Sequence, residues 1–170
     1  MGSALYYTAT GTLNYFGATG TAGVLMDRAG NLPLIPLTMP IAALNGYYST
    51  GLTTFQGLGL LTIDPSNQFS TNGKISRTLT FQSILEVTVG VTAEVRLYNI
   101  TGGYAVTGST LTSTATSPTL VSGSLTIGSS PNILNSSQLY EVQLRISVPS
   151  SPADTDRAIC KMGSISITWS

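Results

Sequence analysis

The fold class of this chain is decided by the stretch Tyr140-Glu141-Val142-Gln143-Leu144-Arg145-Ile146-Ser147-Val148. Apolar and polar residues alternate here with a period of two, which is the spacing of side chains on the two faces of a β-strand. The side chains predicted to face the core are Tyr140, Val142, Leu144, Ile146 and Val148. Such a strand, with one buried and one solvated face, is typical of an antiparallel sheet.

The same alternation recurs elsewhere in the chain. It predicts further strands in the ranges 58–63, 79–81, 85–91, 93–97, 125–127 and 164–169. Clusters of Gly, Pro, Ser and Asn predict turns at 101–103, 117–118, 128–132 and 149–152. Few windows have a helical period, which excludes parallel β/α folds. We therefore expect an all-β protein, an antiparallel β-sandwich or jelly roll with an extended N-terminal arm.

The composition divides the chain at about residue 73. Residues 74–170 hold most of the predicted strands and form the predicted sandwich domain. Residues 1–73 are rich in Pro and Gly, and we predict an N-terminal arm that contains some strands. Because this part differs so much from the rest, we expect it to be used in assembly.

One segment of the predicted arm, residues 32–44, is strongly apolar and contains three prolines. Proline disfavours both a helix and a central strand, so an extended conformation is expected. The apolar side chains must still be hidden from water, either on the sandwich of the same chain or on a partner. In the second case the assembly residues are Leu32, Pro33, Leu34, Ile35, Pro36, Leu37, Met39, Pro40 and Ile41.

The chain carries very little charge. It has seven Lys and Arg and seven Asp and Glu in 170 residues, or 8%, where an ordinary soluble domain has about 25%. Residues 29–63 and 97–140 contain no charged side chain. A protein with so few charges and no net charge has little repulsion between its copies. We therefore expect neighbouring subunits to cover much of the surface, in a homo-oligomer that belongs to a particle or a fibre.

The residue types present exclude several kinds of catalytic site. The chain has no His and one Cys, so neither Ser-His-Asp and Cys-His systems nor the usual zinc sites can form. Two close carboxylates could still hydrolyse a glycoside. However, Glu86, Glu94 and Glu141 lie in alternating strands, and we interpret them as solvated or as cross-strand partners of Arg96 and Arg145. The sequence predicts no enzyme.

No cofactor, metal, nucleic-acid or membrane site is predicted. Asp154-Thr155-Asp156 has too few carboxylates for an EF-hand loop and is interpreted as a solvated loop with Arg157 as counter-ion. The basic residues are scattered, which disfavours nucleic acid. No segment resembles a membrane helix, and the N-terminus lacks a signal-peptide pattern.

The aromatic residues and the single Cys have ordinary interpretations beside functional ones. The tyrosines at 6–7, 47–48 and 98/104 are candidates for a sugar platform, but filling of the core or of an interface is the favoured interpretation. Trp169 continues the inward alternation of the last strand and is predicted to lie in the core. Cys160 is predicted to be a small buried apolar residue.

Several motifs in the second half of the chain resemble a known module. They are Val95-Arg96-Leu97-Tyr98-Asn99-Ile100-Thr101-Gly102-Gly103, then Thr110-Leu111-Thr112-Ser113, then Tyr140-Glu141-Val142-Gln143-Leu144-Arg145, and the alternating strand 165–169. Together these motifs resemble a β-sandwich module common in virion proteins of tailed bacteriophages. The resemblance extends approximately over residues 79–169.

The resemblance implies a structural role and no catalytic residues. Small stand-alone chains of this group are similar to capsid decoration, or cement, proteins, which bind the outer surface of the capsid. We therefore expect a decoration protein that bridges and stabilises subunits of the major capsid protein. A homotrimer is favoured because joined copies multiply a modest affinity. Longer chains of the group are tail or fibre proteins, so the alternative is a receptor- or carbohydrate-binding head of a tail fibre.

Overall fold

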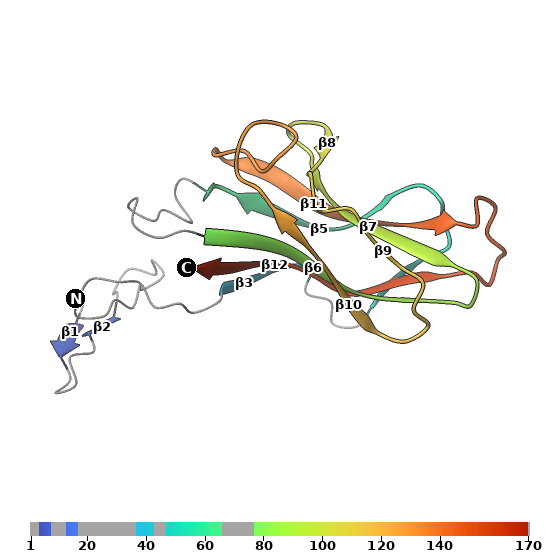
Figure 1. The fold of residues 1–170 in the computed structure, drawn as a ribbon, viewed down its shortest axis with the longest axis horizontal. Helices are drawn as coiled ribbons and strands as arrows, with labels where there is room; N and C mark the ends of the chain where they lie inside the picture. Colours follow the sequence, from blue (N-terminus) through green and yellow to red (C-terminus); the bar gives the residue numbers. More distant parts are fainter. Residues whose placement is uncertain (1–3, 8–12, 17–36, 43–46, 66–76, 170) are drawn as a thin grey trace.

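The structure is a computed structural model that describes residues 4–7, 13–16, 37–42, 47–65 and 77–169. Strands make up most of this part of the chain (Figure 1). They are β1 (Ala4–Tyr7), β2 (Leu13–Phe16), β3 (Leu37–Ala42), β4 (Tyr48–Thr50), β5 (Gln56–Ile63), β6 (Arg77–Val87), β7 (Thr92–Asn99), β8 (Tyr104–Ala105), β9 (Leu111–Ser113), β10 (Thr119–Leu125), β11 (Gln138–Val148) and β12 (Ala158–Trp169).

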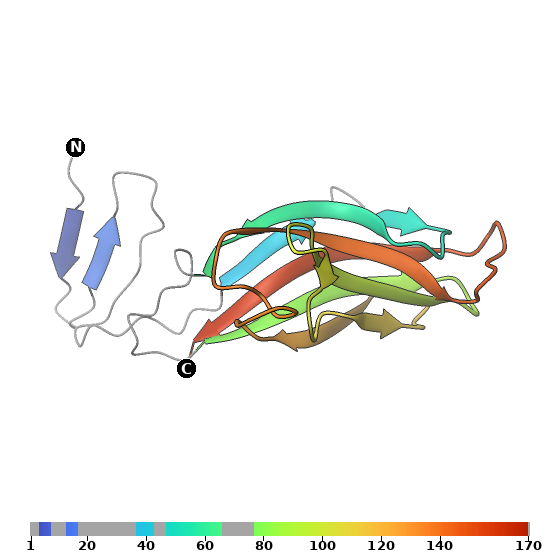
Figure 2. The ribbon, with the colours of Figure 1, turned by 90° about the horizontal axis from the view of Figure 1, so that it is seen from above.

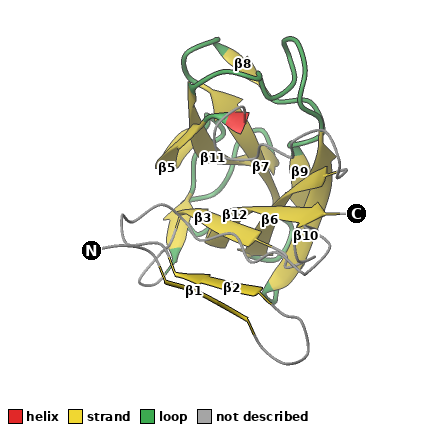
Figure 3. Cartoon of the chain, turned by 90° about the vertical axis from the view of Figure 1, so that its left-hand side faces the viewer, coloured by secondary structure: helices red, strands yellow, loops and turns green. Residues whose placement is uncertain are grey.

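Two sheets form a sandwich, and Figure 3 shows them as two layers. The first sheet has the order β10-β6-β12-β3, with β4 also paired to β12. The second sheet has the order β5-β11-β7-β8, with β9 also paired to β7. β1 and β2 pair with each other, apart from both sheets.

The strand pairs of the sandwich are nested: the first strands along the chain pair with the last strand, and the strands that follow pair with those that precede it. β3 and β4 pair with β12, β5 with β11, β6 with β10, and β7 with β8 and β9. Two further pairs, β6 with β12 and β7 with β11, join these units into sheets. Every one of these strand pairs is antiparallel, and this nested order is that of a jelly roll. The predicted fold class, an antiparallel sandwich or jelly roll, is therefore confirmed.

Three strands of the sandwich precede residue 74. β3 and β4 cover one edge of β12, and β5 covers one edge of β11. The sandwich thus includes residues 37–42, 48–50 and 56–63, which the predicted division at residue 73 placed with the N-terminal arm and its strands. The reason is that β11 and β12 are central strands, and each would lose one row of backbone hydrogen bonds without these neighbours.

The core lies between the two sheets and is built by the alternation seen in the sequence. Tyr140, Val142, Leu144 and Ile146 of β11 are fully buried, as predicted. The buried tyrosine keeps its hydroxyl hydrogen-bonded, because this oxygen accepts from the backbone N–H of Leu134 at 3.2 Å. The other buried apolar side chains are Ile63, Leu79, Phe81, Leu85, Val87, Val91, Ala93, Val95, Leu97, Val106, Leu125, Ile133, Ala158, Cys160, Ile165 and Ile167.

Two of the residues predicted to face inward do not. Val148 is 53% exposed, because the register of β11 against β7 shifts between Ile146 and Val148. Val89 is 86% exposed, because β6 ends at Val87 and the chain turns through Gly90, whose φ of 84° favours glycine. The predicted strand 85–91 is therefore the end of β6 followed by a turn that crosses from one sheet to the other. The side chain of Trp169 lies outside the described residues.

Candidate assembly surfaces

The described residues offer little for catalysis or metal binding. No group of three or more His, Cys, Asp or Glu side chains within them is close enough to hold a metal ion. In the loop before β12, the Asp156 carboxylate accepts from the backbone N–H of Ala153 at 2.8 Å. The Arg157 guanidinium donates to the carbonyls of Asp154 and Asp156 at 2.7 and 2.6 Å. These bonds stabilise the loop itself. None of the described helical segments is long and apolar enough to cross a membrane.

The strand carboxylates form cross-strand contacts. Glu94 pairs with Arg145 at 2.8 Å, which confirms one of the expected partnerships. Glu86 pairs instead with Lys161, also at 2.8 Å, because β12 lies next to β6 in the first sheet. Glu141 accepts a hydrogen bond from Gln143 at 2.7 Å.

Three exposed aliphatic side chains lie at one end of the sandwich, and we call them the aliphatic tip: Leu52, Val89 and Val148. They are 53%, 86% and 53% exposed. They come from the loops after β4 and β6 and from the end of β11, which lie at the end of the sandwich away from the C-terminus (Figures 1 and 2). Ile100, another exposed apolar residue, follows β7 and lies at the opposite end.

Hydrogen bonds between loops hold the aliphatic tip in place. The backbone N–H of Ile146 donates to the carbonyl of Leu52 at 2.8 Å. Thr88, beside Val89, donates its N–H to the carbonyl of Arg157 at 3.1 Å, and its hydroxyl accepts from the Arg157 N–H at 2.9 Å. These bonds fix the backbone beside Leu52 and Val89, so exposed apolar side chains are presented at this end of the sandwich, which suits a protein contact.

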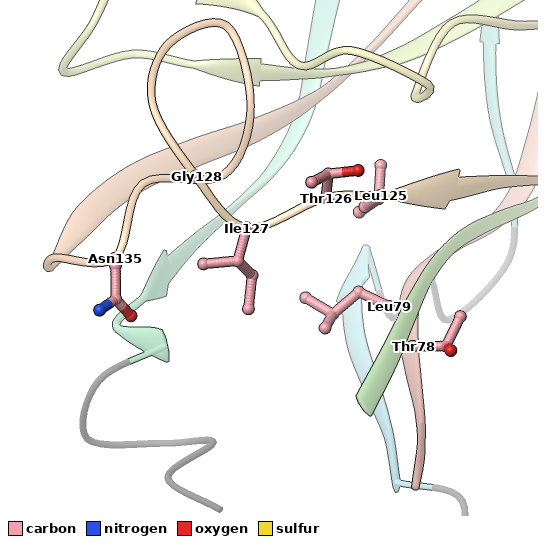
Figure 4. A pocket seen from close by; sticks show the side chains of 7 residues that line it. All are labelled: Thr78, Leu79, Leu125, Thr126, Ile127, Gly128 and Asn135. Carbon is pink, nitrogen blue, oxygen red and sulfur yellow. The ribbon is translucent and has the colours of Figure 1, made fainter. Parts of the chain in front are cut away.

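A hollow of about 560 Å³ lies between the start of β6 and the loop that follows β10. Its apolar walls are Leu79, Leu125 and Ile127, and Figure 4 shows Leu79 and Ile127 pointing toward each other. Thr78, Thr126, Gly128 and Asn135 complete the described lining. None of these lining residues is charged, so the hollow suits an apolar side chain better than an ion.

The predicted apolar assembly segment is only partly within the described residues. Residues 37–42 form β3, an edge strand, and this agrees with the expectation that proline keeps the segment out of a central strand. Pro40 pairs with Ser164, next to a register shift. Leu32, Pro33, Leu34, Ile35 and Pro36 lie outside the described residues.

The tyrosines and one glycosylation triplet have clear structural surroundings. Tyr140 lies in the core, and Tyr48 and Tyr104 pack against it. Asn99, which begins an Asn-Ile-Thr triplet, is fully buried and bonds Gly102 and Tyr104 through its amide. A folded chain therefore offers no access to this Asn for a glycan.

The fold was compared with known proteins. No protein-family model and no curated protein sequence matches this chain. It is similar to VP2 of infectious bursal disease virus in a subviral particle, with a TM-score of 0.50 and 14% identity over 92% of this chain and 42% of that one. A chain of the T13 particle of that virus gives 0.49 and 14%, over 92% and 40%. A chain of its Gt strain gives 0.48 and 15%, over 92% and 41%.

The likeness concerns the fold. This chain spans about two fifths of the length of the VP2 chain, and the identity between them is low. Both the nested strand order and the similarity to VP2 lead to the same description. The chain has a jelly-roll β-sandwich fold, similar to that found in the VP2 chain.

Proposed function

We propose that this chain is a structural virion protein that acts by protein–protein contact. The observation that carries the proposal is the aliphatic tip, since three aliphatic side chains that are each more than half exposed come from loops and a strand end at the same end of the sandwich. The low charge of the chain supports it, because an uncharged surface costs little to desolvate in a large interface. The similarity of the fold to a viral capsid chain supports it as well.

In its finer form, the proposal is a decoration protein of a tailed bacteriophage. Each copy binds the outer surface of the capsid and bridges neighbouring subunits of the major capsid protein, which resists opening of the shell. A homotrimer of the chain multiplies a modest affinity for one site. The apolar segment of residues 32–41 contributes the contact between copies, because its sequence offers apolar side chains without charge.

The tip is tested with the triple variant Leu52→Asp, Val89→Asp and Val148→Asp. The matched control is Ile100→Asp, an exposed apolar residue at the other end. Binding is measured by co-sedimentation with capsids of the same virus that lack this protein. We expect the triple variant to lose binding and the control to keep it, with unchanged circular dichroism in both. Equal binding by the unmodified chain, the triple variant and the control would overturn the role of the tip.

The apolar segment is tested in the full-length chain with Leu34→Glu and Ile35→Glu. These substitutions leave β3 intact, whereas a deletion through residue 45 would also remove an edge strand that pairs with β12. We expect the trimer to dissociate to monomers, as measured by sedimentation equilibrium. A variant that stays trimeric would show that the contact between copies lies elsewhere.

The second candidate function is a receptor- or carbohydrate-binding head of a tail fibre. It is favoured by one observation, an aromatic residue on an outer sheet face with amide and carboxylate neighbours: Tyr98 pairs across strands with Glu141, next to Gln143. A glycan array separates the two candidates, since saturable glycan binding favours the fibre head and capsid binding without glycan binding favours the decoration protein.

A further inference from the structure

The outer face of the second sheet concentrates charge in a chain that has little. Three cross-strand pairs between β7 and β11 lie next to one another on this face: Glu94 with Arg145, Arg96 with Gln143, and Tyr98 with Glu141. All six side chains are partly exposed, and they alternate with the buried side chains of the same strands. The face is therefore ordered by the sheet itself.

Arg96 is held in a fixed position on this face. Its guanidinium carbon lies 3.6 Å from the centre of the Phe55 ring and 4.8 Å from that of the Tyr98 ring. Its Nε donates to Oε1 of Gln143 at 2.9 Å. In the part of the chain that the structure describes, the terminal nitrogens of Arg96 have no acceptor. Two aromatic rings and one hydrogen bond thus orient a guanidinium whose outer fork is open.

The neighbouring arginine is used differently. The guanidinium carbon of Arg145 lies 4.4 Å from the centre of the same Phe55 ring. However, a terminal nitrogen of Arg145 is already bonded to the carboxylate of Glu94 at 2.8 Å. Burial lowers the pKa of Arg96, an effect that Tyr98 partly opposes, and the group stays charged at neutral pH. A partly desolvated cation with free donors is best satisfied by a carboxylate, which accepts two parallel bonds from the fork.

Groups suited to a sugar lie beside Arg96 on the same face, at the next cross-strand pair, Tyr98 with Glu141. Glu141 accepts from Gln143 through one carboxylate oxygen, and its other oxygen has no partner among the described residues. A carboxylate oxygen accepts well from a hydroxyl, and the ring of Tyr98 can stack on the C–H face of a pyranose. An acidic peptide would offer the carboxylate without hydroxyl donors for Glu141.

We propose that Phe55, Arg96, Tyr98, Glu141 and Gln143, the Arg96 platform, bind a saccharide that carries a carboxylate, such as a sialic or uronic acid. The carboxylate lies on the fork of Arg96, a hydroxyl donates to Glu141, and the ring packs on Tyr98. This proposal rests on the second candidate function and names its site and its ligand class.

The test uses the full-length chain and three probes: 3′-sialyllactose, a glucuronic-acid disaccharide and neutral lactose. Saturation-transfer NMR and calorimetry measure binding. The variants are Arg96→Lys, which keeps the charge but loses the fork, and Tyr98→Leu. The matched control is Lys161→Gln, which removes a cation from the other sheet. We expect at least one acidic sugar to bind, and Arg96→Lys to weaken it roughly tenfold or more. The control keeps full affinity.

Each other outcome overturns a defined part of the proposal. Equal binding of lactose and the acidic sugars would keep carbohydrate binding but reject the carboxylate contact. Binding that survives Arg96→Lys would place the sugar elsewhere. No binding of either acidic sugar at roughly 10 mM would reject the site. Tighter binding of a hexaglutamate peptide than of the sugars would assign the site to a protein partner. Thermal unfolding of each variant shows that it is folded.

Discussion

The hydroxyl of Ser83 on β6 donates a hydrogen bond of 2.7 Å to the carbonyl oxygen of Met162 on β12. The contact lies at a bulge, since Cys160 pairs with Leu85 and Met162 with Ile84, which leaves Lys161 as an extra residue of β12. A bulge interrupts the backbone ladder, and the buried serine supplies a donor to this carbonyl, which also accepts from the thiol of Cys160 at 3.2 Å. Ser83 is therefore a structural residue of the first sheet.

Replacement of Ser83 by Ala is expected to lower the free energy of unfolding by about 0.5–1.5 kcal/mol. The partly buried carbonyl of Met162 then loses its hydroxyl donor and keeps only the weaker thiol donor of Cys160 at 3.2 Å. Urea denaturation measures the change. Ser122→Ala, at an exposed position of β10, is the control and should change stability by less than about 0.5 kcal/mol. Equal stability of the two variants would mean that the thiol of Cys160 satisfies the carbonyl of Met162 without the serine.

The same bulge explains how far the sequence predicts β12. Ala158 and Cys160 face the core before the bulge, and Ile165 and Ile167 face it after the bulge, so the inward positions change from even to odd numbers. A period-two pattern detects only the second half, which is why 164–169 was predicted and the start of the strand was not. Bulges depend on pairing partners that the local sequence does not contain.

The candidate surfaces were less predictable than the strands. The pair Glu94–Arg145 follows from alternation alone, and it was expected. The place of Phe55 against Arg96 and Arg145 depends on how the loop before β5 crosses the sheet, which no local pattern encodes. Val89 carried a usable signal, because the glycine that follows it marks a turn.

Two glycines with similar backbone angles are expected to respond differently to alanine. Gly90 has a φ of 84° and open space where a Cβ would lie, whereas Gly108 has a φ of 81° and lies against the carbonyl oxygen of Ser124. Gly90→Ala should therefore cost about 1–2 kcal/mol, the price of a left-handed conformation. Gly108→Ala should cost clearly more, because backbone must also move.

The melting temperatures of the two glycine variants measure this difference. A matched loss in both would show that β10 shifts easily away from Gly108. The contact between Gly108 and the carbonyl of Ser124 would then contribute little to the stability of the sandwich at β10.

The stability of the chain is expected to fall at alkaline pH because of Cys160. Burial raises the pKa of this thiol, and hydrogen bonds with Ser83 and Met162 oppose the shift only partly. Above about pH 8.5, where an unfolded thiol ionises, the unfolded state binds fewer protons than the folded state. The free energy of unfolding must then decrease as pH rises.

Urea denaturation at pH 7.5 and 9.5 measures this effect of Cys160. Cys160→Ala is less stable at both values because it leaves a cavity, but its stability should depend less on pH. The higher pH of the series stays below the ordinary pKa of tyrosine, about 10. Burial also raises the pKa of Tyr140, so its ionisation in the unfolded state above that pH would add a second effect of the same sign. The same pH dependence in both proteins would assign the effect to other groups.

The turn after β7 is expected to behave as one coupled unit. Asn99 is fully buried, and its Oδ1 accepts from the N–H of Gly102 at 2.7 Å. Its Nδ2 donates to the hydroxyl of Tyr104 at 3.1 Å, and that hydroxyl donates to the carbonyl of Asn132 at 3.0 Å. The chain of bonds ties the turn to the loop before β11. Because one hydroxyl serves both partners, removal of either group weakens the bond of the other.

A double-mutant cycle with Asn99→Ala and Tyr104→Phe measures this coupling through urea denaturation. Each single variant should lose about 1–3 kcal/mol of stability, and the double variant should lose less than the sum by about 0.5 kcal/mol or more. Tyr47→Phe, at an exposed tyrosine, should leave stability unchanged. If the two losses simply add, Asn99 acts through Gly102 alone, and the hydroxyl of Tyr104 stabilises only the loop at Asn132.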